Sequence, residues 1–211
     1  MNSQDRKFRA LGLTLTACVA VTAFAQSDIA QDVVAAAVPV EIEAPAFSPL
    51  EVHPRTSLTV VEQLRYNHYV TKPLDDGISS DVFDKYLDTL DGGRAYFVAA
   101  DIVEFEQYRY TLDDALKRAN LDPAFTMYNR YQTRVVERLQ FLLTQLNQGI
   151  ANTDFSADES IEIDRENSAW PRTQAEQDDL WRKRLKAAVL SMKLNGKEFT
   201  EIQDVLTKRY K

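Results

Sequence analysis

Histidine and cysteine, two residue types that often carry catalysis or bind metals, are scarce in this chain. It contains two histidines, His53 and His68, and a single cysteine, Cys18. This set cannot supply the four clustered ligands of a structural zinc site. The sequence also lacks a G-x-S-x-G nucleophile elbow, a P-loop and a G-x-G-x-x-G fingerprint. We therefore expect no catalytic residue, no metal ligand and no cofactor here, and we interpret His68 as a partly buried residue on a helix face.

The charged residues are typical of solvated helix faces. Lys and Arg number 25 against 32 Asp and Glu, which gives a net charge of −7. A nucleic-acid-binding protein needs a basic surface, so we expect no nucleic-acid partner. The basic run from Arg182 to Lys186 could serve an anionic partner. We expect it instead to form ion pairs with Asp178 and Asp179 about one helical turn away.

Aromatic residues are the more promising group, with ten Phe, nine Tyr and two Trp. Both tryptophans lie in the charge-rich segment 164–186. Helical spacing favours core and groove packing for most of the aromatics. The alternative is a partner-binding groove, because Tyr, Trp and Arg are the favoured anchors of protein interfaces. Our candidates for structural or partner-contact roles are Trp170, Pro171, Trp181, Tyr128 and Tyr131.

Residues 1–25 have the pattern of a secretory signal peptide. Basic residues precede the apolar stretch 11–25, which ends in the cleavage pattern Ala23-Phe24-Ala25. The stretch is short for a transmembrane helix. We expect cleavage after Ala25 and a periplasmic protein. The alternative is a lipoprotein, because residues 15–18 resemble a lipobox that would leave Cys18 lipidated and the protein anchored in the membrane.

The rest of the chain divides into a leader and a helical domain. Residues 26–55 are rich in Ala, Val, Pro and Glu without a sustained period, and we interpret them as a flexible leader. Residues 56–211 predict an all-α fold, with five or six amphipathic helices in an irregular bundle. In the acidic loop before Trp170, Ile161 and Ile163 alternate with Glu162, which allows one short β-element.

Capping and terminator residues predict where the helices begin and end. The first helix starts near Thr59 and stops before Pro73. The second runs over 80–91 and ends at Gly92-Gly93 as a left-handed cap. The third extends from Asp101 to about 116. The remaining helices are predicted over 122–149, from the capping box 173–176 to 194, and over 200–211.

Several ordered segments resemble the N-terminal region of bacterial tail-specific proteases, the periplasmic carboxy-terminal processing peptidases. The segments are DVFDKYLDTLD, AADIVEF, FTMYNRYQTRVVERLQFLL, DRENSAWPRTQAEQDDLWRKRLK and LTKRYK. Together they cover roughly residues 58–211, and the most specific among them is D-R-x-x-x-x-W-P followed by a D-L-W helix.

The resemblance implies a fold and a context. In that family the region is a helical domain beside a protease core, which contains a PDZ domain and a serine nucleophile with a lysine base. The partners implied are this core and PDZ domain of the same protein, an adaptor lipoprotein and unfolded protein substrates. No catalytic residue of the family has a counterpart among these 211 residues. The resemblance also implies that Trp170-Pro171 clamps the acidic loop and that Trp181 buries its helix.

Two functions are compatible with this pattern. The first is the N-terminal helical domain of a periplasmic tail-specific serine protease, which supports substrate or adaptor engagement. The second is a stand-alone periplasmic helical binding or adaptor module without enzymatic activity. The last predicted helix ends without a glycine or proline terminator. We therefore expect the natural chain to continue past Lys211, which favours the first function.

Overall fold

A computed structural model describes residues 44–70, 72–151 and 153–211. The predicted signal peptide, the lipobox around Cys18 and residues 26–43 lie outside this part. All regular structure in the described part is helical, which confirms the all-α fold class. The helices are α1 (Val52–Asn67), α2 (Asp76–Asp91), α3 (Ala99–Phe105), the 3-10 helix η1 (Glu106–Tyr108), α4 (Leu112–Lys117), α5 (Asp122–Asn147), α6 (Gln174–Leu194) and α7 (Phe199–Tyr210).

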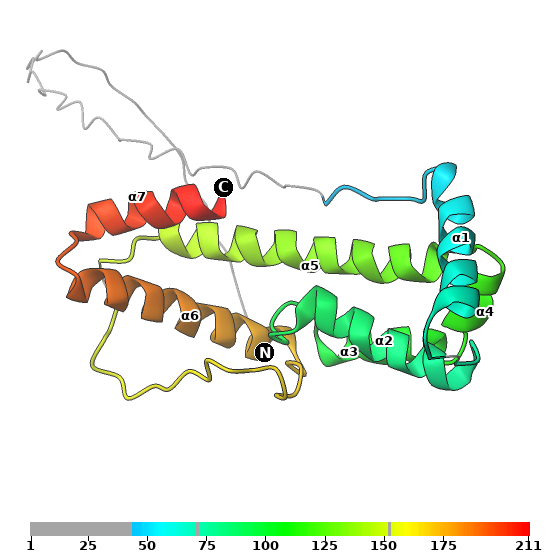
Figure 1. Cartoon of the computed structure of the whole chain (residues 1–211). Coiled ribbons are helices and arrows are strands. Elements are labelled where there is room, and N and C mark those ends of the chain that lie inside the picture. The colour runs from blue at the N-terminus through cyan, green and yellow to red at the C-terminus, as the bar shows by residue number, and fades with distance from the viewer. Residues whose placement is uncertain (1–43, 71, 152) are drawn as a thin grey trace, which may run out of the picture. The chain divides into compact units, whose positions relative to one another are not determined.

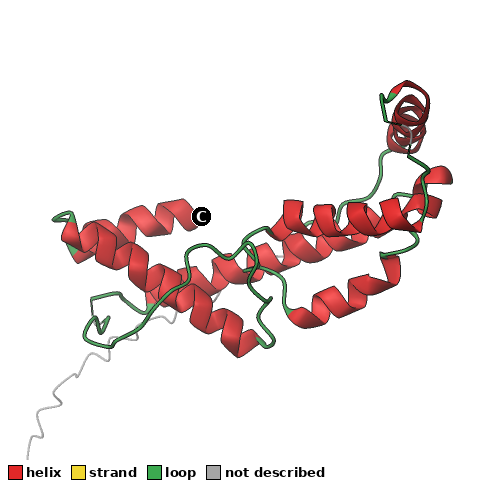
Figure 2. Cartoon of the chain, turned by 60° about the horizontal axis from the view of Figure 1, so that its bottom comes forward, coloured by secondary structure: helices red, strands yellow, loops and turns green. Residues whose placement is uncertain are grey.

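The long helix α5 organises the other helices of this part. It has 26 residues, or about 39 Å at a rise of about 1.5 Å per residue. Figures 1 and 2 show α2 and α3 beside its first half, and α6 and α7 beside its second half. Helix α1 crosses near the start of α5 and packs on α4 (Figure 1). Because α5 contacts helices in both halves of the bundle, it is the helix that joins the two halves.

The buried apolar side chains form two clusters along α5. The first cluster joins α2, α3, α4 and α5, and its members are Phe83, Leu87, Phe97, Phe105, Leu112 and Met127. The second joins α5, α6 and α7, and its members are Ala95, Leu142, Leu146, Ile150, Trp181, Leu185, Val189, Ile202 and Leu206. Burial of these side chains contributes about 1.5–3 kcal/mol for each large one. Residues 92–98, between α2 and α3, supply members of both clusters.

Several helix ends follow the sequence signals. Pro123 lies in the first turn of α5, where its missing N–H costs no hydrogen bond. The Thr173 hydroxyl accepts a hydrogen bond from Glu176 N at 3.1 Å, which confirms the cap of α6. Gly196, just after α6, has a φ of +82°, which glycine adopts without strain.

Other boundaries differ from the predictions. Helix α1 begins at Val52, within the predicted leader and seven residues before Thr59. The predicted single third helix is broken into α3, η1 and α4. Residues 161–163 belong to an irregular loop, so the short strand is not formed. The predicted left-handed cap at Gly92-Gly93 was wrong in detail, because Gly92, just after α2, has right-handed backbone angles and the left-handed residue is Arg94, at φ +44°.

Helix α1 buries less than the other long helices. None of its residues is buried, and Leu64 and Tyr66 are 57% and 77% exposed. Within the part of the chain that the structure describes, no helix combines the length and apolar composition that membrane crossing requires.

Candidate functional site

Each of the two histidines lies against a different aromatic ring. His53 stacks on Phe125, with 6.2 Å between the ring centroids. His68 is exposed and lies against Tyr69, so the prediction of partial burial was wrong. It is the C-cap residue that follows the last turn of α1. Across residues 44–70, 72–151 and 153–211, no three His, Cys, Asp or Glu side chains are grouped so that they could hold a metal ion.

The connector between α2 and α3, residues 92–98, is held by one buried carboxylate. Asp91 is 3% exposed. Its Oδ1 accepts a hydrogen bond from Ala95 N at 2.9 Å, and its Oδ2 accepts from the N–H groups of Tyr96 and Phe97 at 3.0 and 2.9 Å. The Trp170 indole donates to Oδ2 at 3.2 Å. Burial raises the pKa of Asp91, whereas these four N–H donors favour the ionised form.

Helix α6 binds the opposite, carbonyl side of the same connector. Trp181 Nε1 donates to Ala95 O at 2.9 Å, and Gln177 Nε2 donates to the carbonyls of Ala95 and Tyr96. Gln177 is fully buried, and these bonds satisfy its N–H donors, whereas its Oε1 has no hydrogen-bond partner among the described residues. Asp91 therefore binds the N–H groups of the connector, and α6 binds its carbonyl groups.

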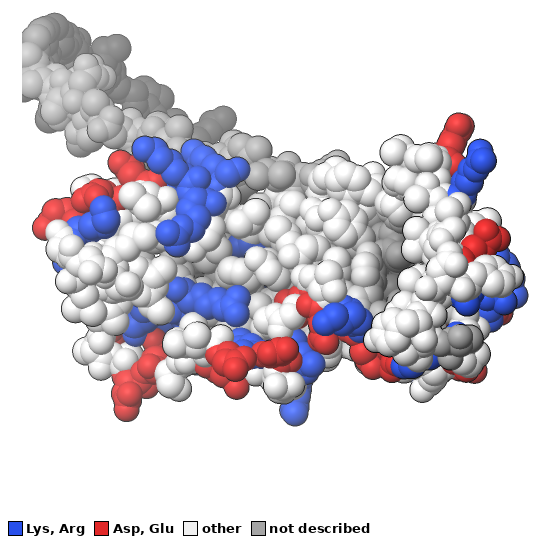
Figure 3. Space-filling view, viewed as in Figure 1, with Lys and Arg blue, Asp and Glu red and all other residues white. Residues whose placement is uncertain are grey.

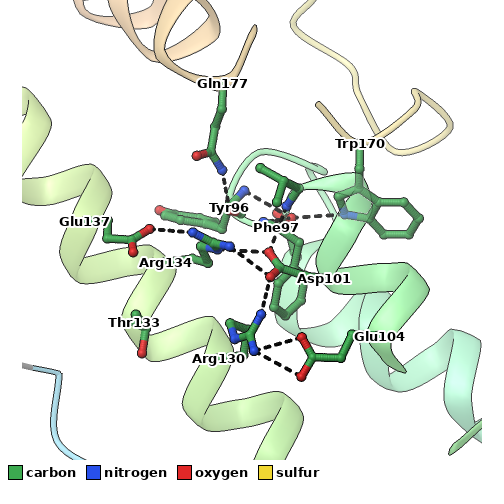
Figure 4. Close-up of polar contacts among 12 residues, drawn as sticks. Tyr96, Phe97, Asp101, Glu104, Arg130, Thr133, Arg134, Glu137, Trp170 and Gln177 are labelled. Atoms are coloured by element: carbon green, nitrogen blue, oxygen red, sulfur yellow. Dashed lines mark hydrogen bonds and ion pairs between the residues drawn. The ribbon is translucent and has the colours of Figure 1, made fainter. Parts of the chain in front are cut away.

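A buried ion cluster ties α3 to α5, as Figure 4 shows. Asp101 is 1% exposed and accepts from Arg134 at 2.9 Å and from Arg130 at 2.6 Å. It also accepts from Val98 N at 3.0 Å, at the start of α3. Burial raises the pKa of Asp101, but the hydrogen bonds from Arg134, Val98 and Arg130 outweigh burial and hold the pKa below its ordinary value.

A second ion pair ties α5 to α6. The Arg138 side chain is almost fully buried and pairs with Asp178, and its guanidinium lies 5.2 Å from the Phe141 ring centroid. Removal of one partner from such a pair leaves an uncompensated charge, which is strongly destabilising. The pair therefore fixes how α6 lies on α5.

Trp170 and Pro171 hold the chain before α6 against the connector. The Trp170 ring packs on the first apolar cluster, and the Arg94 guanidinium lies 4.4 Å from the ring centroid. Pro171 is buried, and its carbonyl accepts from Ala99 N at 2.8 Å. These contacts give both residues a structural role at the start of α3.

The tyrosines of α5 are half-buried and have different neighbours. The Tyr131 ring meets Tyr96 and Phe97 edge-on, at centroid distances of 5.4 and 5.9 Å. The Tyr128 ring meets Phe47 at 5.6 Å, where Asn129 makes two hydrogen bonds to the Phe47 backbone. Tyr131 thus contacts the connector, whereas Tyr128 contacts the segment that leads to α1.

Sequence reasoning missed the polar residues on which this arrangement depends. Asp91 is spaced by four from Leu87, and Gln177 is spaced by four from Trp181, so each lies on a buried helix face. A polar residue at such a position must find a partner inside the fold. This spacing in the sequence could have identified Asp91 and Gln177 as buried polar residues.

An apolar groove lies between α1, α2 and α4. It has a volume of about 440 Å³, and its lining residues are Val61, Leu64, Arg65, His68, Tyr69, Val70, Lys72, Pro73, Leu74, Ile78, Val82 and Leu116. Tyr69 is 92% exposed and Leu64 57%. Arg65, Lys72 and His68 are the basic residues of this lining, which contains no Asp or Glu. Exposed apolar surface edged by polar groups marks an interaction site.

The basic run of α6 pairs with Asp179, as the sequence predicted, but not with Asp178, which pairs with Arg138 of α5 instead. Arg182 and Lys183 both lie 2.8 Å from Asp179. Arg182 and Lys186 also pair with Glu159 of the acidic loop and hold its pKa at about 2. These pairs attach the acidic loop to α6.

Truncation of Trp181 should cost much of the domain's stability. Trp181→Ala removes a core ring and the hydrogen bond to Ala95 O, so we expect a loss of about 3–5 kcal/mol in the free energy of unfolding. Urea unfolding followed by circular dichroism measures it. Leu190→Ala is the control, because Leu190 is 39% exposed on the same helix. An unchanged free energy for Trp181→Ala would contradict the structural role.

Acid should weaken the Asp101 cluster. Because the folded-state pKa of Asp101 lies below its ordinary value of 3.8, its stabilisation is complete above about pH 4 and is lost as the pH falls through the lowered pKa. Asp101→Asn should lower stability at neutral pH and flatten the acid dependence, measured by urea unfolding across pH. Asp81→Asn, at an exposed position of α2, serves as the control. A wild-type acid dependence in Asp101→Asn would refute this linkage.

Comparison with known proteins identifies the family. The family described as "Tail specific protease N-terminal domain" matches residues 60–211. The protein named "Tail-specific protease" of Haemophilus influenzae is 35% identical over 173 residues, which are 82% of this chain and 24% of the relative. The chain thus spans about a quarter of the length of the curated relative that it matches. These findings confirm the resemblance, and the chain belongs to the tail-specific protease N-terminal domain family.

Proposed function

We propose that these residues form the N-terminal helical domain of a periplasmic tail-specific serine protease and support the engagement of unfolded substrate or of an adaptor. The PDZ and serine–lysine catalytic domains are, in this proposal, carried by other parts of the protein. Family membership over residues 60–211 supports the assignment as a domain. The apolar groove is the observation that supports engagement of a polypeptide.

The groove fits an unfolded chain in shape and chemistry. Its apolar floor comes from three helices, and its exposed edge carries Leu64 and Tyr69. Unfolded polypeptides expose apolar side chains that folded proteins bury, so they gain most from such a surface. Its cationic edge adds attraction for acidic segments.

Substitutions in the groove should weaken the binding of an unfolded protein without unfolding the domain. We expect Leu64→Ser with Tyr69→Ser to weaken the binding of reduced, carboxymethylated α-lactalbumin by roughly tenfold, since two exposed apolar anchors are lost. Fluorescence anisotropy of the labelled probe measures the affinity.

Two controls make this experiment specific. Tyr110→Ser removes an apolar side chain that is 59% exposed and does not line the groove, so it should bind as the wild type does. Native α-lactalbumin should bind neither protein. Equal affinity of the groove variant and the wild type would remove the groove from the proposal.

The proposed periplasmic location predicts the mature N-terminus. Cleavage after Ala25 should leave Gln26 as the first residue of the protein recovered from its source, as intact-mass spectrometry and N-terminal sequencing can measure. A mass that corresponds to a lipidated Cys18 would show an anchored lipoprotein instead. An uncleaved Met1 would contradict export by this signal.

A further inference from the structure

Arg184 of α6 has an unusual environment for an arginine. It is half-buried, and its guanidinium carbon lies 5.0 Å from the centroid of the Trp181 ring. A guanidinium nitrogen also lies close to Gly93 of the connector, 3.9 Å from where a Cβ would be. Among the described residues, Arg184 makes no hydrogen bond or ion pair. A guanidinium has five N–H donors, so those of Arg184 remain open to solvent or to a ligand.

The neighbours of Arg184 in sequence are all paired. Arg182 and Lys183 bind Asp179, and Lys186 binds Glu159. Every basic residue of the run except Arg184 therefore has an acidic partner. The sequence allowed two interpretations of the run, internal ion pairs or an anionic partner. Arg184 is the residue of the run for which an anionic partner is still possible.

A second arginine, Arg165, lies near Arg184 and is itself paired with Glu162. Burial and the nearby Arg165 lower its pKa, and the opposing influences come from Tyr96 and Asp91. Asp91 already accepts four N–H groups, so it is not free to bind this arginine. Figure 3 shows blue side chains gathered over the end of α7 and over α6 below it. An added anion would relieve the repulsion at this surface.

The chemistry of the surface selects its ligand. A guanidinium offers paired N–H donors that match the two oxygens of a carboxylate. The aromatic floor formed by Trp181 and Tyr96, whose ring centroids are 5.1 Å apart, suits the backbone and apolar stem of a peptide. A chain of net charge −7 repels polyanions such as nucleic acids. The ligand that fits best is a single carboxylate carried by a polypeptide.

We propose that Arg184, lying on Trp181 beside Tyr96, binds a carboxylate group of a polypeptide that contacts this domain. This inference rests on the proposed function, because it assumes that the domain engages a polypeptide. It adds a second contact point to the groove between α1, α2 and α4, and it specifies the chemical group that is recognised.

Matched peptides test the inference on the unmodified chain. Two short fluorescent peptides, both amidated at the C-terminus, differ only in a central Glu or Gln between leucines. A third carries Gln and a free C-terminal carboxylate. We expect the chain to bind the Glu peptide about tenfold more tightly than the Gln peptide by fluorescence anisotropy, a difference typical of a charge-assisted hydrogen bond. Tight binding of the third peptide would identify a chain terminus as the source of the carboxylate.

Variants then assign the difference to Arg184. Arg184→Gln should abolish the preference for Glu, whereas Arg184→Lys should retain part of it, because lysine keeps the charge but not the planar pair of donors. Arg172→Gln removes one exposed positive charge just before α6 and should keep the full preference. Circular dichroism checks that each variant is folded.

Three results would overturn the inference. The first is equal binding of the Glu and Gln peptides by the wild-type chain, which requires no variant. The second is a preference for Glu that survives in Arg184→Gln. The third is displacement of the Glu peptide by inorganic phosphate at constant ionic strength, which would identify a phosphate site. If unfolded α-lactalbumin still binds while the preference is absent, the proposed function stands and this inference alone fails.

Discussion

The structure depends on one constraint, which is that the connector buries its backbone at Ala95 and Phe97, where the two apolar clusters meet. Buried N–H and carbonyl groups must find partners, and this irregular segment cannot provide them itself. Asp91 accepts from three of its N–H groups, and α6 donates to two of its carbonyls through Gln177 and Trp181. The same bonds that satisfy the connector therefore fix α6 against α2.

The charged contacts of α5 have a different consequence from its apolar contacts. Apolar burial stabilises many alternative registers of a helix pair, because it has little directionality. Arg134 and Arg138, one turn apart, each reach a different acidic partner, Asp101 of α3 and Asp178 of α6. A shift of α5 by one residue would separate both pairs. These ions thus select one arrangement of three helices, at a cost in desolvation that the apolar clusters offset.

Features that depend on residues close together in the sequence could be predicted, whereas features that depend on residues far apart in the sequence could not. The proline in the first turn of α5 and the Thr173 cap of α6 are local, and these sequence signals located the starts of both helices. The break between α3 and α4 is not local. Ser79 of α2 donates to Arg109 O and accepts from Leu112 N, so a residue about 30 positions away stabilises the interruption. The connector and Gln177 escaped prediction for the same reason, although their polar residues occupy buried faces of their helices.

The two surfaces assigned to partners share a physical origin. In a folded domain most exposed apolar groups are scattered and most buried charges are paired. The groove beside α1 gathers exposed apolar side chains on a helix with no buried residue, and Arg184 leaves a half-buried guanidinium without an acceptor. Each departs from the rules that the rest of the bundle follows. Because Asp91, Gln177 and Trp181 already bind the backbone groups of Ala95, Tyr96 and Phe97, the unsatisfied donors of Arg184 are available to a group from outside the domain.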